Sequence, residues 1–471
     1  IFTPQMEKIK FGTDGWRAII AKDFTVQNVA RVSKGLADWL YTKTQQPTVV
    51  IGHDCRFGGP LFVETVSRVL CDNGIKVYVA KGFVSTPMVS YGVLAKKADQ
   101  GVVITASHNP PAYNGYKLKG AHGGPANPGD IAEVEALIPD QYTVPEESLE
   151  HYEQKGLLEF IDLEQMYLDY LHTKFDFAQL NNSAFKLAYD AMYGAGQNVV
   201  RKLMPSAVLL HCEQNPTFNG TAPEPLYKNT KELSALMKNT SELKLGLVTD
   251  GDADRIGLYD EDGNFVDAHH ILLLLVHYLA KYKQMTGKVI IAFSVTDRVK
   301  RMCEQYGLPV EVTPIGFKYI SEKIVTEDVL VGGEESGGIA VKGHIPERDG
   351  IYDGLVLLEF MVATGKSLKE LIQEVYDVVG PFVYQRDDLT LPNEQKETII
   401  NNAGNDVYNK GFGQYGVTHV EKIDGVKYHL ENGGWVMLRA SGTEPLLRIY
   451  AEGSSEEETL EILKAVKATI L

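Results

Sequence analysis

Cysteine is scarce in this chain of 471 residues, and its four cysteines lie far apart. They are Cys55, Cys71, Cys212 and Cys303. No two of them have the close spacing of a zinc or redox motif. We therefore expect buried free thiols at these positions.

Long apolar runs are also missing. The longest, Ile271 to Val276, is far too short to cross a bilayer. The start of the sequence has no basic region followed by an apolar one, which a secretory signal would require. These two absences predict a cytoplasmic protein with no membrane partner.

Clustered positive charge is the third missing feature. The chain has 46 Lys and Arg against 62 Asp and Glu, a formal net charge of −16. A nucleic-acid surface needs grouped Lys and Arg, so we expect no nucleic-acid partner. If the substrate is an anion, positive charge has to be concentrated locally, which gives weight to any Arg or Lys beside a Gly-rich loop.

The composition is that of a soluble globular protein, with 44% hydrophobic and 23% charged residues. A chain this long exceeds what one hydrophobic core usually organises. Three or four domains are therefore expected.

A strand, helix, strand pattern occurs three times along the chain. The copies are 48–52, 61–71 and 75–80; 185–190, 197–203 and 207–211; and 288–293, 297–306 and 310–313. Beyond Gly380-Pro381 come strand-like runs at 427–430, 435–438 and 446–451 and a helical pattern at 455–471. The pattern predicts three similar mixed α/β domains and a C-terminal α+β domain. We place their limits at 1–150, 151–256, 257–379 and 380–471.

The first chemical feature is a serine at the end of an expected strand. Ser107 lies in Thr105-Ala-Ser-His-Asn-Pro110, directly after the apolar run Gly101 to Ile104 and ahead of an Asn-Gly turn expected at Asn114-Gly115. In open α/β sheets, ligands gather at the carboxyl ends of strands. From these residues alone, hydrolase, phosphatase and structural interpretations of Ser107 are all open.

The second feature is the acidic segment Asp250-Gly-Asp252-Ala-Asp254-Arg255, which follows the apolar run Leu245 to Val248. Alternating carboxylates are hard oxygen ligands suited to Mg²⁺ or Ca²⁺. An EF-hand loop is disfavoured because Arg255 stands where that loop needs glycine and the flanks are strand-like. An acidic surface turn is the remaining alternative, although Arg255 could hold a ligand phosphate.

Two Gly-containing loops follow. In 332–338, Glu334 and Ser336 offer an acceptor and a donor for sugar hydroxyls, although such a loop alone is more typical of a structural turn. The other is a phosphate cradle without Walker spacing, with a hairpin loop as the alternative. Its residues are Arg439, Ser441, Gly442, Thr443 and Arg448.

These four segments, TASHNP, DGDADR, GEESGG and RASGTEPLLR, resemble those of the α-D-phosphohexomutase superfamily in order and spacing. The opening 11–17, FGTDGWR, is similar to the family's first-domain entry, whose arginine, here Arg17, faces the active site. The resemblance implies four domains around a central active-site cleft. It also implies a phosphoglucomutase or phosphomannomutase.

The resemblance further implies a role for each segment. Ser107 would be carried as phosphoserine and share Mg²⁺ with Asp250, Asp252 and Asp254, while His108 and Arg255 steady the phosphoryl group. Lys117 would be a general acid or base. Glu334 and Ser336 would bind the sugar, and Arg439, Ser441, Gly442, Thr443 and Arg448 the phosphate that is not reacting.

Four further residues are assigned to substrate binding: Arg17, Lys318, His344 and Arg348. The phosphomannomutase-like branch ends its sugar loop with histidine where this chain has Gly338, so His344 and Arg348 are also candidates for the second acid-base group.

The implied reaction interconverts hexose 1-phosphate and hexose 6-phosphate through a hexose 1,6-bisphosphate that also serves as activator. The sequence GEES favours glucose, with mannose also used and glucosamine as an alternative. A metal-dependent sugar phosphatase and a non-catalytic sugar-phosphate or Mg²⁺-binding protein are the other interpretations. A monomer or weak dimer is expected.

Overall fold

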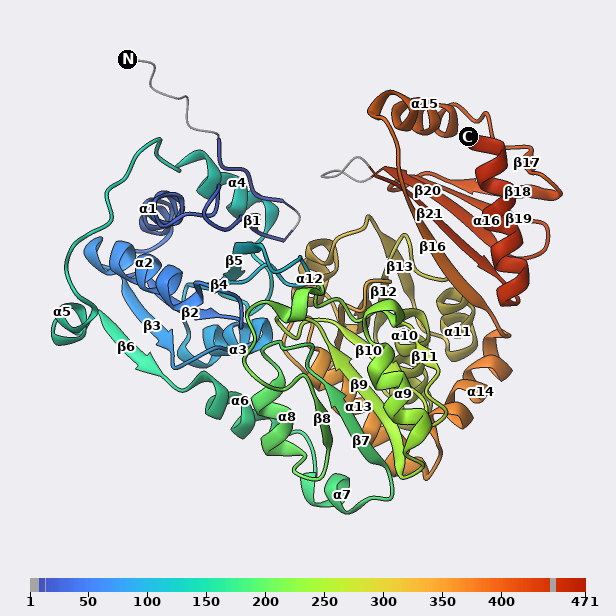
Figure 1. Cartoon of the computed structure of the whole chain (residues 1–471), viewed down its shortest axis with the longest axis horizontal. Coiled ribbons are helices and arrows are strands. Elements are labelled where there is room, and N and C mark those ends of the chain that lie inside the picture. Colours follow the sequence, from blue (N-terminus) through green and yellow to red (C-terminus); the bar gives the residue numbers. More distant parts are fainter. Residues whose placement is uncertain (1–7, 13, 441–445) are drawn as a thin grey trace. The chain divides into compact units, whose positions relative to one another are not determined.

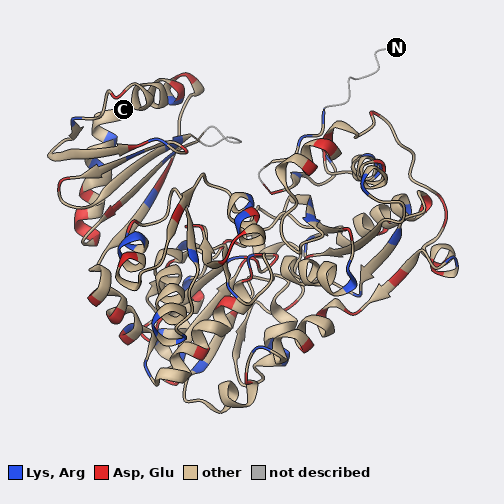
Figure 2. Cartoon of the chain, turned by 180° about the vertical axis from the view of Figure 1, so that it is seen from behind, with Lys and Arg blue, Asp and Glu red and all other residues tan. Residues whose placement is uncertain are grey.

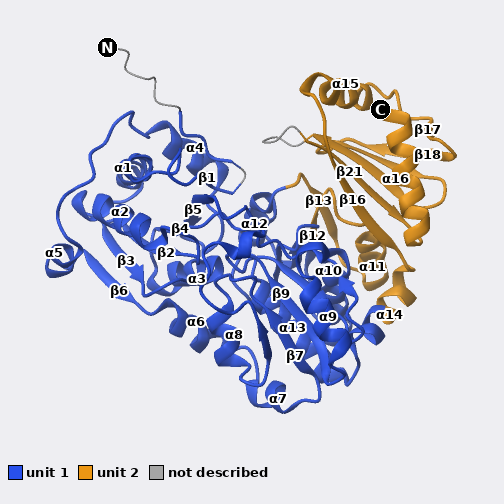
Figure 3. Cartoon of the chain, viewed as in Figure 1, with its two compact units in different colours: residues 1–289, 316–372 blue, residues 290–315, 373–471 orange. Residues whose placement is uncertain are grey.

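The computed structural model of the chain describes residues 8–12, 14–440 and 446–471 (Figure 1). The chain divides into two compact units, which Figure 3 colours separately. Unit 1 comprises residues 1–289 and 316–372, and unit 2 comprises residues 290–315 and 373–471. The chain therefore enters unit 2 twice. The four domain limits taken from the sequence stay predictions.

The first sheet belongs to unit 1 and has the strand order β1-β5-β4-β2-β3-β6. Its strands are β1 (Trp16–Ile19), β2 (Thr48–His53), β3 (Lys76–Ala80), β4 (Gln100–Ile104), β5 (Tyr113–Gly120) and β6 (Leu158–Ile161). Strands β4, β2, β3 and β6 pair in parallel, whereas β5 pairs antiparallel with β4, and β1 antiparallel with β5, at one edge. The sheet is therefore mixed, with a parallel centre.

Helices cover both faces of this sheet. Val49 and Ile51 of β2 share a core with residues of α1 (Val26–Lys43) and α2 (Gly59–Asp72). On the other face lies α3 (Thr86–Lys96), where a Cβ added at Gly92 would be 3.3 Å from Val50. A parallel strand buried on both sides needs a continuous apolar run, which is what 49–51 supplies.

The second sheet also lies in unit 1, in the order β11-β10-β9-β7-β8. Its strands are β7 (Lys186–Asp190), β8 (Val208–Leu210), β9 (Leu243–Thr249), β10 (Ile256–Tyr259) and β11 (Phe265–Val266). The third is made of β12 (Lys288–Ala292), β13 (Val310–Thr313), β14 (Val329–Gly333) and β15 (Ile339–Val341). Both contain one of the repeated strand, helix, strand patterns.

The fourth sheet lies in unit 2, and all its pairings are antiparallel, in the order β16-β21-β20-β19-β18-β17. Its strands are β16 (Val383–Thr390), β17 (Gly411–Phe412), β18 (Tyr415–Glu421), β19 (Val426–Leu430), β20 (Trp435–Ala440) and β21 (Leu446–Gly453). Residues of α15 (Asn393–Gly404) and α16 (Glu456–Ile470) share its core. The expected fold class, three mixed α/β domains and a different C-terminal domain, is confirmed.

The remaining α-helices complete the architecture. They are α4 (Pro128–Ala136), α5 (Leu149–Gln154), α6 (Leu163–His172), α7 (Phe177–Asn182), α8 (Gln197–Leu203), α9 (Lys231–Asn239), α10 (Ala268–His277), α11 (Arg298–Tyr306), α12 (Phe317–Thr326), α13 (Gly350–Thr364) and α14 (Leu368–Val379). None of the helices in the described residues combines the length and apolar character needed to cross a bilayer. Lys and Arg are interspersed with Asp and Glu in both units (Figure 2). All four cysteines are buried and free.

One local expectation is wrong. Asn114 and Gly115 do not form a turn but lie within β5, opposite Ala18 and Arg17 of β1. A Cβ at Gly115 would come within 2.5 Å of the Thr105 carbonyl oxygen and 2.8 Å of that of Trp16. The glycine is therefore needed for close backbone approach in a strand rather than for a turn conformation.

Close packing at Gly52, near the end of β2, yields a testable expectation. An added Cβ would lie 2.5 Å from Val84 Cγ2 and 2.7 Å from Val89 Cγ2. Overpacking of this kind costs about 1–3 kcal/mol, so Gly52→Ala should lower the guanidinium unfolding midpoint. Gly129→Ala in α4, where no atom lies within 4 Å of the new Cβ, is the control and should not lower it. Equal midpoints for the two variants would contradict this account.

Candidate active site

The serine segment 105–110 and the acidic segment 250–255 meet at two strand ends of unit 1. Ser107 follows β4, and Asp250 follows β9 of the second sheet. The Ser107 Oγ donates a hydrogen bond of 2.8 Å to Asp250 Oδ2, and Ser107 is only 1% exposed. The structure thus joins two segments that are 143 residues apart in sequence.

Ser107 has a backbone conformation that non-glycine residues rarely adopt, with φ at +53°. Its N–H donates to Thr105 Oγ1 at 2.9 Å, and the Thr105 hydroxyl donates to Asp54 at 2.6 Å. The Arg56 guanidinium donates to four carbonyl oxygens of the same loop, those of Ser107, Asn109, Pro110 and Tyr113. These bonds hold the strained loop in place.

Arg56 was missed by sequence reasoning, although its position offers a signal. It lies three residues after the end of β2, the strand next to β4. The carboxyl ends of neighbouring parallel strands lie at one edge of a sheet, so a buried arginine there can reach the serine loop.

Asp250, Asp252 and Asp254 together could hold a metal ion. Among the described residues, they are the group of clustered His, Cys, Asp and Glu side chains with ligand atoms close enough together to do so. Their ligand oxygens lie within 4.8 Å of one another, and all three residues are completely buried. Burial, together with the charges of Asp252 and Asp254, raises the pKa of Asp250 well above its usual value. Asp252 Oδ1 and Asp254 Oδ1 are buried without a hydrogen-bond partner. Oxygens left in this way fit a hard cation such as Mg²⁺.

Cationic side chains of unit 1 offset part of this negative charge. Lys117 on β5 places its Nζ 2.9 Å from Asp252, 3.2 Å from Asp254 and 2.9 Å from Asp14. The Arg348 Nη2 lies 2.7 Å from Asp254 and 2.8 Å from Asp14. Burial alone would lower the pKa of the Lys117 ammonium, but the three carboxylates raise it. Lys117 is therefore charged in this arrangement.

Asp14 is a second residue that sequence reasoning missed. It belongs to the 11–17 segment, in which only Arg17 was singled out. Its carboxylate contacts Lys117 and Arg348 and lies 3.6 Å from Arg17. The sequence alone does not show that Asp14 contacts these three cations, because they lie up to 334 residues away along the chain.

Arg17, His108 and Arg255 also lie near the serine. The Arg17 Nη1 donates to Asn109 Oδ1 at 2.7 Å, and His108 Nδ1 lies 3.4 Å from Ser107 Oγ. Burial and the nearby Arg255, Arg17 and Lys117 hold the pKa of His108 well below its usual value. The imidazole is thus neutral, and the cations around it favour an anionic ligand beside Ser107.

The expected sugar loop follows β14. Glu334 is buried, and its Oε1 accepts the N–H of Gly316 at 2.9 Å while Arg348 Nη1 lies 3.9 Å from Oε2. Burial raises the pKa of Glu334 to about 7. Ser336 lies two residues further on, half-buried in the turn.

The Arg348 side chain fills the space that a side chain at position 338 would need. A Cβ at Gly338 would lie 2.4 Å from Arg348 Cδ. A side chain such as histidine at 338 therefore requires Arg348 to move. This gives a steric reason why a chain with Arg348 in this position has glycine at the end of the loop.

His344 and Lys318 are held by other contacts. The His344 ring nitrogens lie 3.0 Å from Tyr170 OH and 2.9 Å from Asp349 Oδ2, and the ring stacks on Tyr352 with centroids 3.7 Å apart. Lys318 is the second residue of α12, with its Nζ 5.1 Å from the ring centroid of Tyr319. Their substrate-binding roles stay predictions.

In unit 2, Arg439 of β20 and Arg448 of β21 are direct partners across the sheet. Their side chains therefore leave the same face, and each has a carboxylate neighbour. The Arg439 Nε is 3.0 Å from Asp424 and the Arg448 Nε 3.8 Å from Asp388. Ser441, Gly442 and Thr443, expected in the phosphate loop, lie outside the described residues.

Comparison with known proteins agrees with this fold and site. Four phosphoglucomutase/phosphomannomutase domain models match in succession: alpha/beta/alpha domain I at residues 8–144, domain II at 165–263, domain III at 267–379 and the C-terminal domain at 390–469. The chain is 30% identical over 460 residues to a probable phosphoglucosamine mutase of Methanosphaera stadtmanae, covering 96% of each chain.

Two other relatives carry different names. The chain is 27% identical over 459 residues to a phosphoglucomutase/phosphomannomutase of Thermococcus kodakarensis, again covering 96% of each. A crystal structure of a candidate phosphomannomutase from Thermus thermophilus superposes with a TM-score of 0.87 at 34% identity, covering 98% of this chain and 99% of the other.

The chain therefore belongs to the α-D-phosphohexomutase superfamily, with all four of the domains that define it. It is a phosphohexomutase, an intramolecular phosphotransferase of the phosphoglucomutase/phosphomannomutase family.

The raised pKa of Glu334 predicts a pH-dependent contribution to stability. The folded state binds this proton more tightly than the unfolded chain, so the contribution is present below pH of about 4.5 and is lost as pH rises through about 7. The loss is at most about 3 kcal/mol. In Glu334→Gln, unfolding free energies measured between pH 5 and 8 should fall less steeply than in the wild type.

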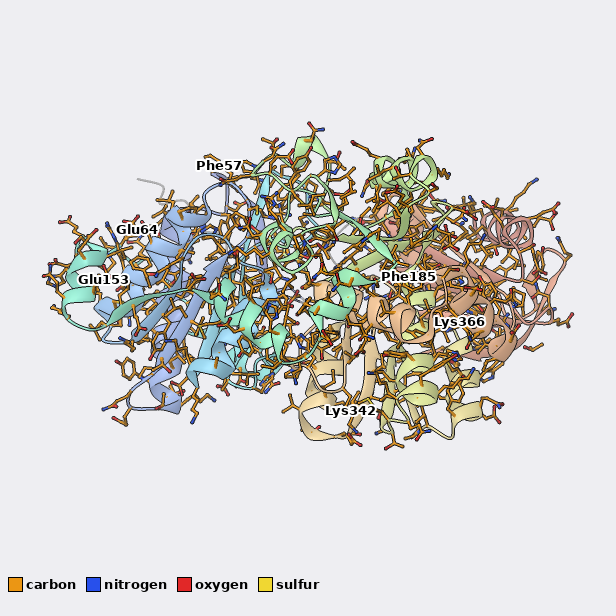
Figure 4. All side chains as sticks on the ribbon, turned by 90° about the horizontal axis from the view of Figure 1, so that it is seen from below. Phe57, Glu64, Glu153, Phe185, Lys342 and Lys366 are labelled. Carbon is orange, nitrogen blue, oxygen red and sulfur yellow. The ribbon has the colours of Figure 1, made fainter. Side chains whose placement is uncertain are left out.

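The control for this prediction is Glu153→Gln, the same change at an exposed position of α5 (Figure 4). Its slope should equal that of the wild type. If Glu334→Gln follows the wild-type slope as well, Glu334 does not titrate in this range.

Proposed function

We propose that this phosphohexomutase interconverts hexose 1-phosphate and hexose 6-phosphate, with glucose favoured and mannose also used, through a phosphorylated Ser107. The observation that carries the proposal is the contact of Ser107 with the buried triad of aspartates, surrounded by Lys117, Arg17, Arg255 and Arg348. A serine hydroxyl is a weak nucleophile by itself. Next to an anion-binding site, it is suited to carry a phosphoryl group.

The proposed reaction has two displacements. In the first, the bond between phosphorus and Ser107 Oγ breaks as a bond forms from phosphorus to the C6 hydroxyl oxygen of hexose 1-phosphate. The bisphosphate then reorients, and Ser107 Oγ takes the other phosphoryl group. Hexose 6-phosphate leaves, and the phosphoserine is restored.

Lys117 is the group we assign to the proton of the sugar hydroxyl. In the first displacement the C6 hydroxyl oxygen passes its proton to Lys117 Nζ, and in the second Lys117 gives a proton to the C1 oxygen as its phosphoryl group moves to Ser107. Asp14, Asp252 and Asp254 favour the ammonium form of Lys117, which suits it to donate in the second displacement. Neutral His108 can donate a hydrogen bond to the phosphoryl group without adding a proton-transfer step of its own.

Asp250, Asp252 and Asp254, with a phosphate oxygen on Ser107, would hold Mg²⁺. When bound there, the ion offsets the negative charge of the phosphoryl group during transfer. The unpartnered oxygens of Asp252 and Asp254 support this assignment.

For the sugar, Glu334 and Ser336 are assigned to hydroxyl groups, and Arg439, Ser441, Gly442, Thr443 and Arg448 to the phosphate that is not reacting. The adjacent guanidiniums of Arg439 and Arg448 support the second assignment. Arg17, Lys318, His344 and Arg348 remain proposed substrate contacts.

Glucosamine is the second candidate sugar, and a specific observation favours it. The relative with 30% identity over 96% of the chain is named a probable phosphoglucosamine mutase. Glucose, mannose and glucosamine phosphates differ at C2, whereas a clamp on other hydroxyls discriminates weakly at that carbon.

Replacing Ser107 tests the covalent step. Ser107→Ala should lower mutase turnover by about a thousandfold or more, because it removes the oxygen that we assign as carrier of the phosphoryl group. Binding of hexose 6-phosphate, followed by calorimetry, should stay within about threefold of the wild-type value. Ser241→Ala, at an exposed position, is the control and should be fully active. Retained turnover in Ser107→Ala would refute the phosphoserine.

A substrate panel tests the sugar assignment. With Mg²⁺ and a trace of hexose 1,6-bisphosphate, kcat/KM should fall in the order glucose, mannose, glucosamine 1-phosphate. A highest value for glucosamine 1-phosphate would instead make the chain a phosphoglucosamine mutase. Steady release of inorganic phosphate without isomer formation would favour the sugar phosphatase.

A further inference from the structure

Asp424, in the turn between β18 and β19, is not among the residues assigned above to binding or catalysis. Its carboxylate accepts two bonds from Arg439: Nε donates to Oδ1 at 3.0 Å, and Nη2 donates to Oδ2 at 3.3 Å. A bidentate pairing of this kind fixes the plane of a guanidinium as well as its position.

The same carboxylate also binds the backbone. Asp424 Oδ2 accepts the N–H of Ile315 at 3.0 Å, and Ile315 lies in the loop after β13 that belongs to unit 2. The side chain of Asp424 is thus held from two sides and can act as a rigid support for Arg439. The following residue of the chain, Gly316, donates its own N–H to Glu334 within unit 1.

The turn that carries Asp424 is built close to Arg439. Gly425 has φ of +93°, and a Cβ there would lie 2.6 Å from the Leu438 carbonyl oxygen and 3.1 Å from Arg439 Cβ. Only glycine allows the turn to lie so near β20 in this conformation. The close approach places the Asp424 carboxylate beside the Nε edge of the arginine.

Arg439 needs such a support. It lies directly opposite Arg448 on the neighbouring strand, and like charges in that position repel each other. The pairing with Asp424 opposes this repulsion. The side chains of Arg439 and Asp424 are 20% and 26% exposed, so the pair lies at the surface of unit 2, where an anion can approach.

We propose that Asp424 is a positioning residue that holds the Arg439 guanidinium ready for the phosphate that is not reacting. The proposal rests on the phosphate-binding role given to Arg439 above. Asp424 binds the edge of the guanidinium formed by Nε and Nη2. It does not touch the substrate but acts through Arg439.

Asp424 has two opposite effects on a phosphate. Its charge repels the anion, whereas its two hydrogen bonds orient the guanidinium. The charge acts across partly solvated surface, where it is weak, while a charge-assisted bidentate pair is among the stronger polar contacts. Orientation therefore outweighs repulsion, and removing the carboxylate should weaken phosphate binding.

The kinetic test is Asp424→Asn, which keeps the shape of the side chain but cannot accept both bonds from Arg439. The KM for the phosphosugar should rise about tenfold with kcat within twofold of the wild-type value, because the contact with the distal phosphate is the same in ground and transition states. Asp424→Glu, which restores the carboxylate, should recover part of the loss. An unchanged or lowered KM would overturn the proposal.

A matched control and a double variant test whether Asp424 acts through Arg439. Asp406→Asn makes the same change at an exposed ion pair with Lys422 in the same unit and should leave KM unchanged. In Arg439→Lys, which cannot form the bidentate pair, adding Asp424→Asn should raise KM by less than threefold more. Full additivity of the two effects would show that Asp424 acts elsewhere.

One measurement keeps this proposal separate from the proposed function. The Nε–H resonance of Arg439, assigned by its loss in Arg439→Lys, should exchange slowly with solvent in the wild type and rapidly in Asp424→Asn, whatever the enzyme turns over. Equal exchange in both would refute the support of Arg439 by Asp424. If the wild type converts no hexose phosphate but the resonance behaves as expected, only the proposed function fails, and inorganic phosphate becomes the probe of binding.

Discussion

The mutual repulsion of three buried carboxylates is the constraint on which the active site depends. Asp250, Asp252 and Asp254 lie within 4.8 Å of one another and out of contact with water. Such a group is costly unless cations surround it. Lys117 and Arg348 supply part of that charge, and they come from β5 and from the segment before α13. Because the cations must reach the aspartates, the first sheet, the second sheet and the segment before α13 are held together at this point.

The sequence allowed much of this to be predicted, because strand ends are visible as apolar runs. Ser107, Asp250 and Glu334 each follow such a run, and the structure places them after β4, β9 and β14. Prediction failed where the partner is distant in sequence. Asp14 and Arg56 act through contacts with residues that no local pattern connects to them. Asn114-Gly115 was misjudged because pairing with β1 overrides the turn preference of that dipeptide.

Arg348 links two features of the sequence that look independent: the carboxylates of Asp14 and Asp254, and the glycine at position 338. Its guanidinium reaches Asp14 and Asp254, and its Cδ lies where a side chain at position 338 would begin. The neighbouring Glu347 carboxylate, fully buried, accepts from Lys119 at 2.6 Å and from Ser90 at 3.1 Å. Glu347 thus anchors the segment that carries Arg348. A relative with a bulky residue at the end of the sugar loop has to place this cation differently.

The double entry of the chain into unit 2 bears on how the protein is made. Phe293 packs in a core with Trp435, Met437 and Tyr450, residues that follow it by more than 140 positions. During synthesis, the 290–315 segment leaves the ribosome long before these partners exist. The core around Phe293 is therefore incomplete until the end of the chain emerges, so folding of this unit has to wait for the C-terminus.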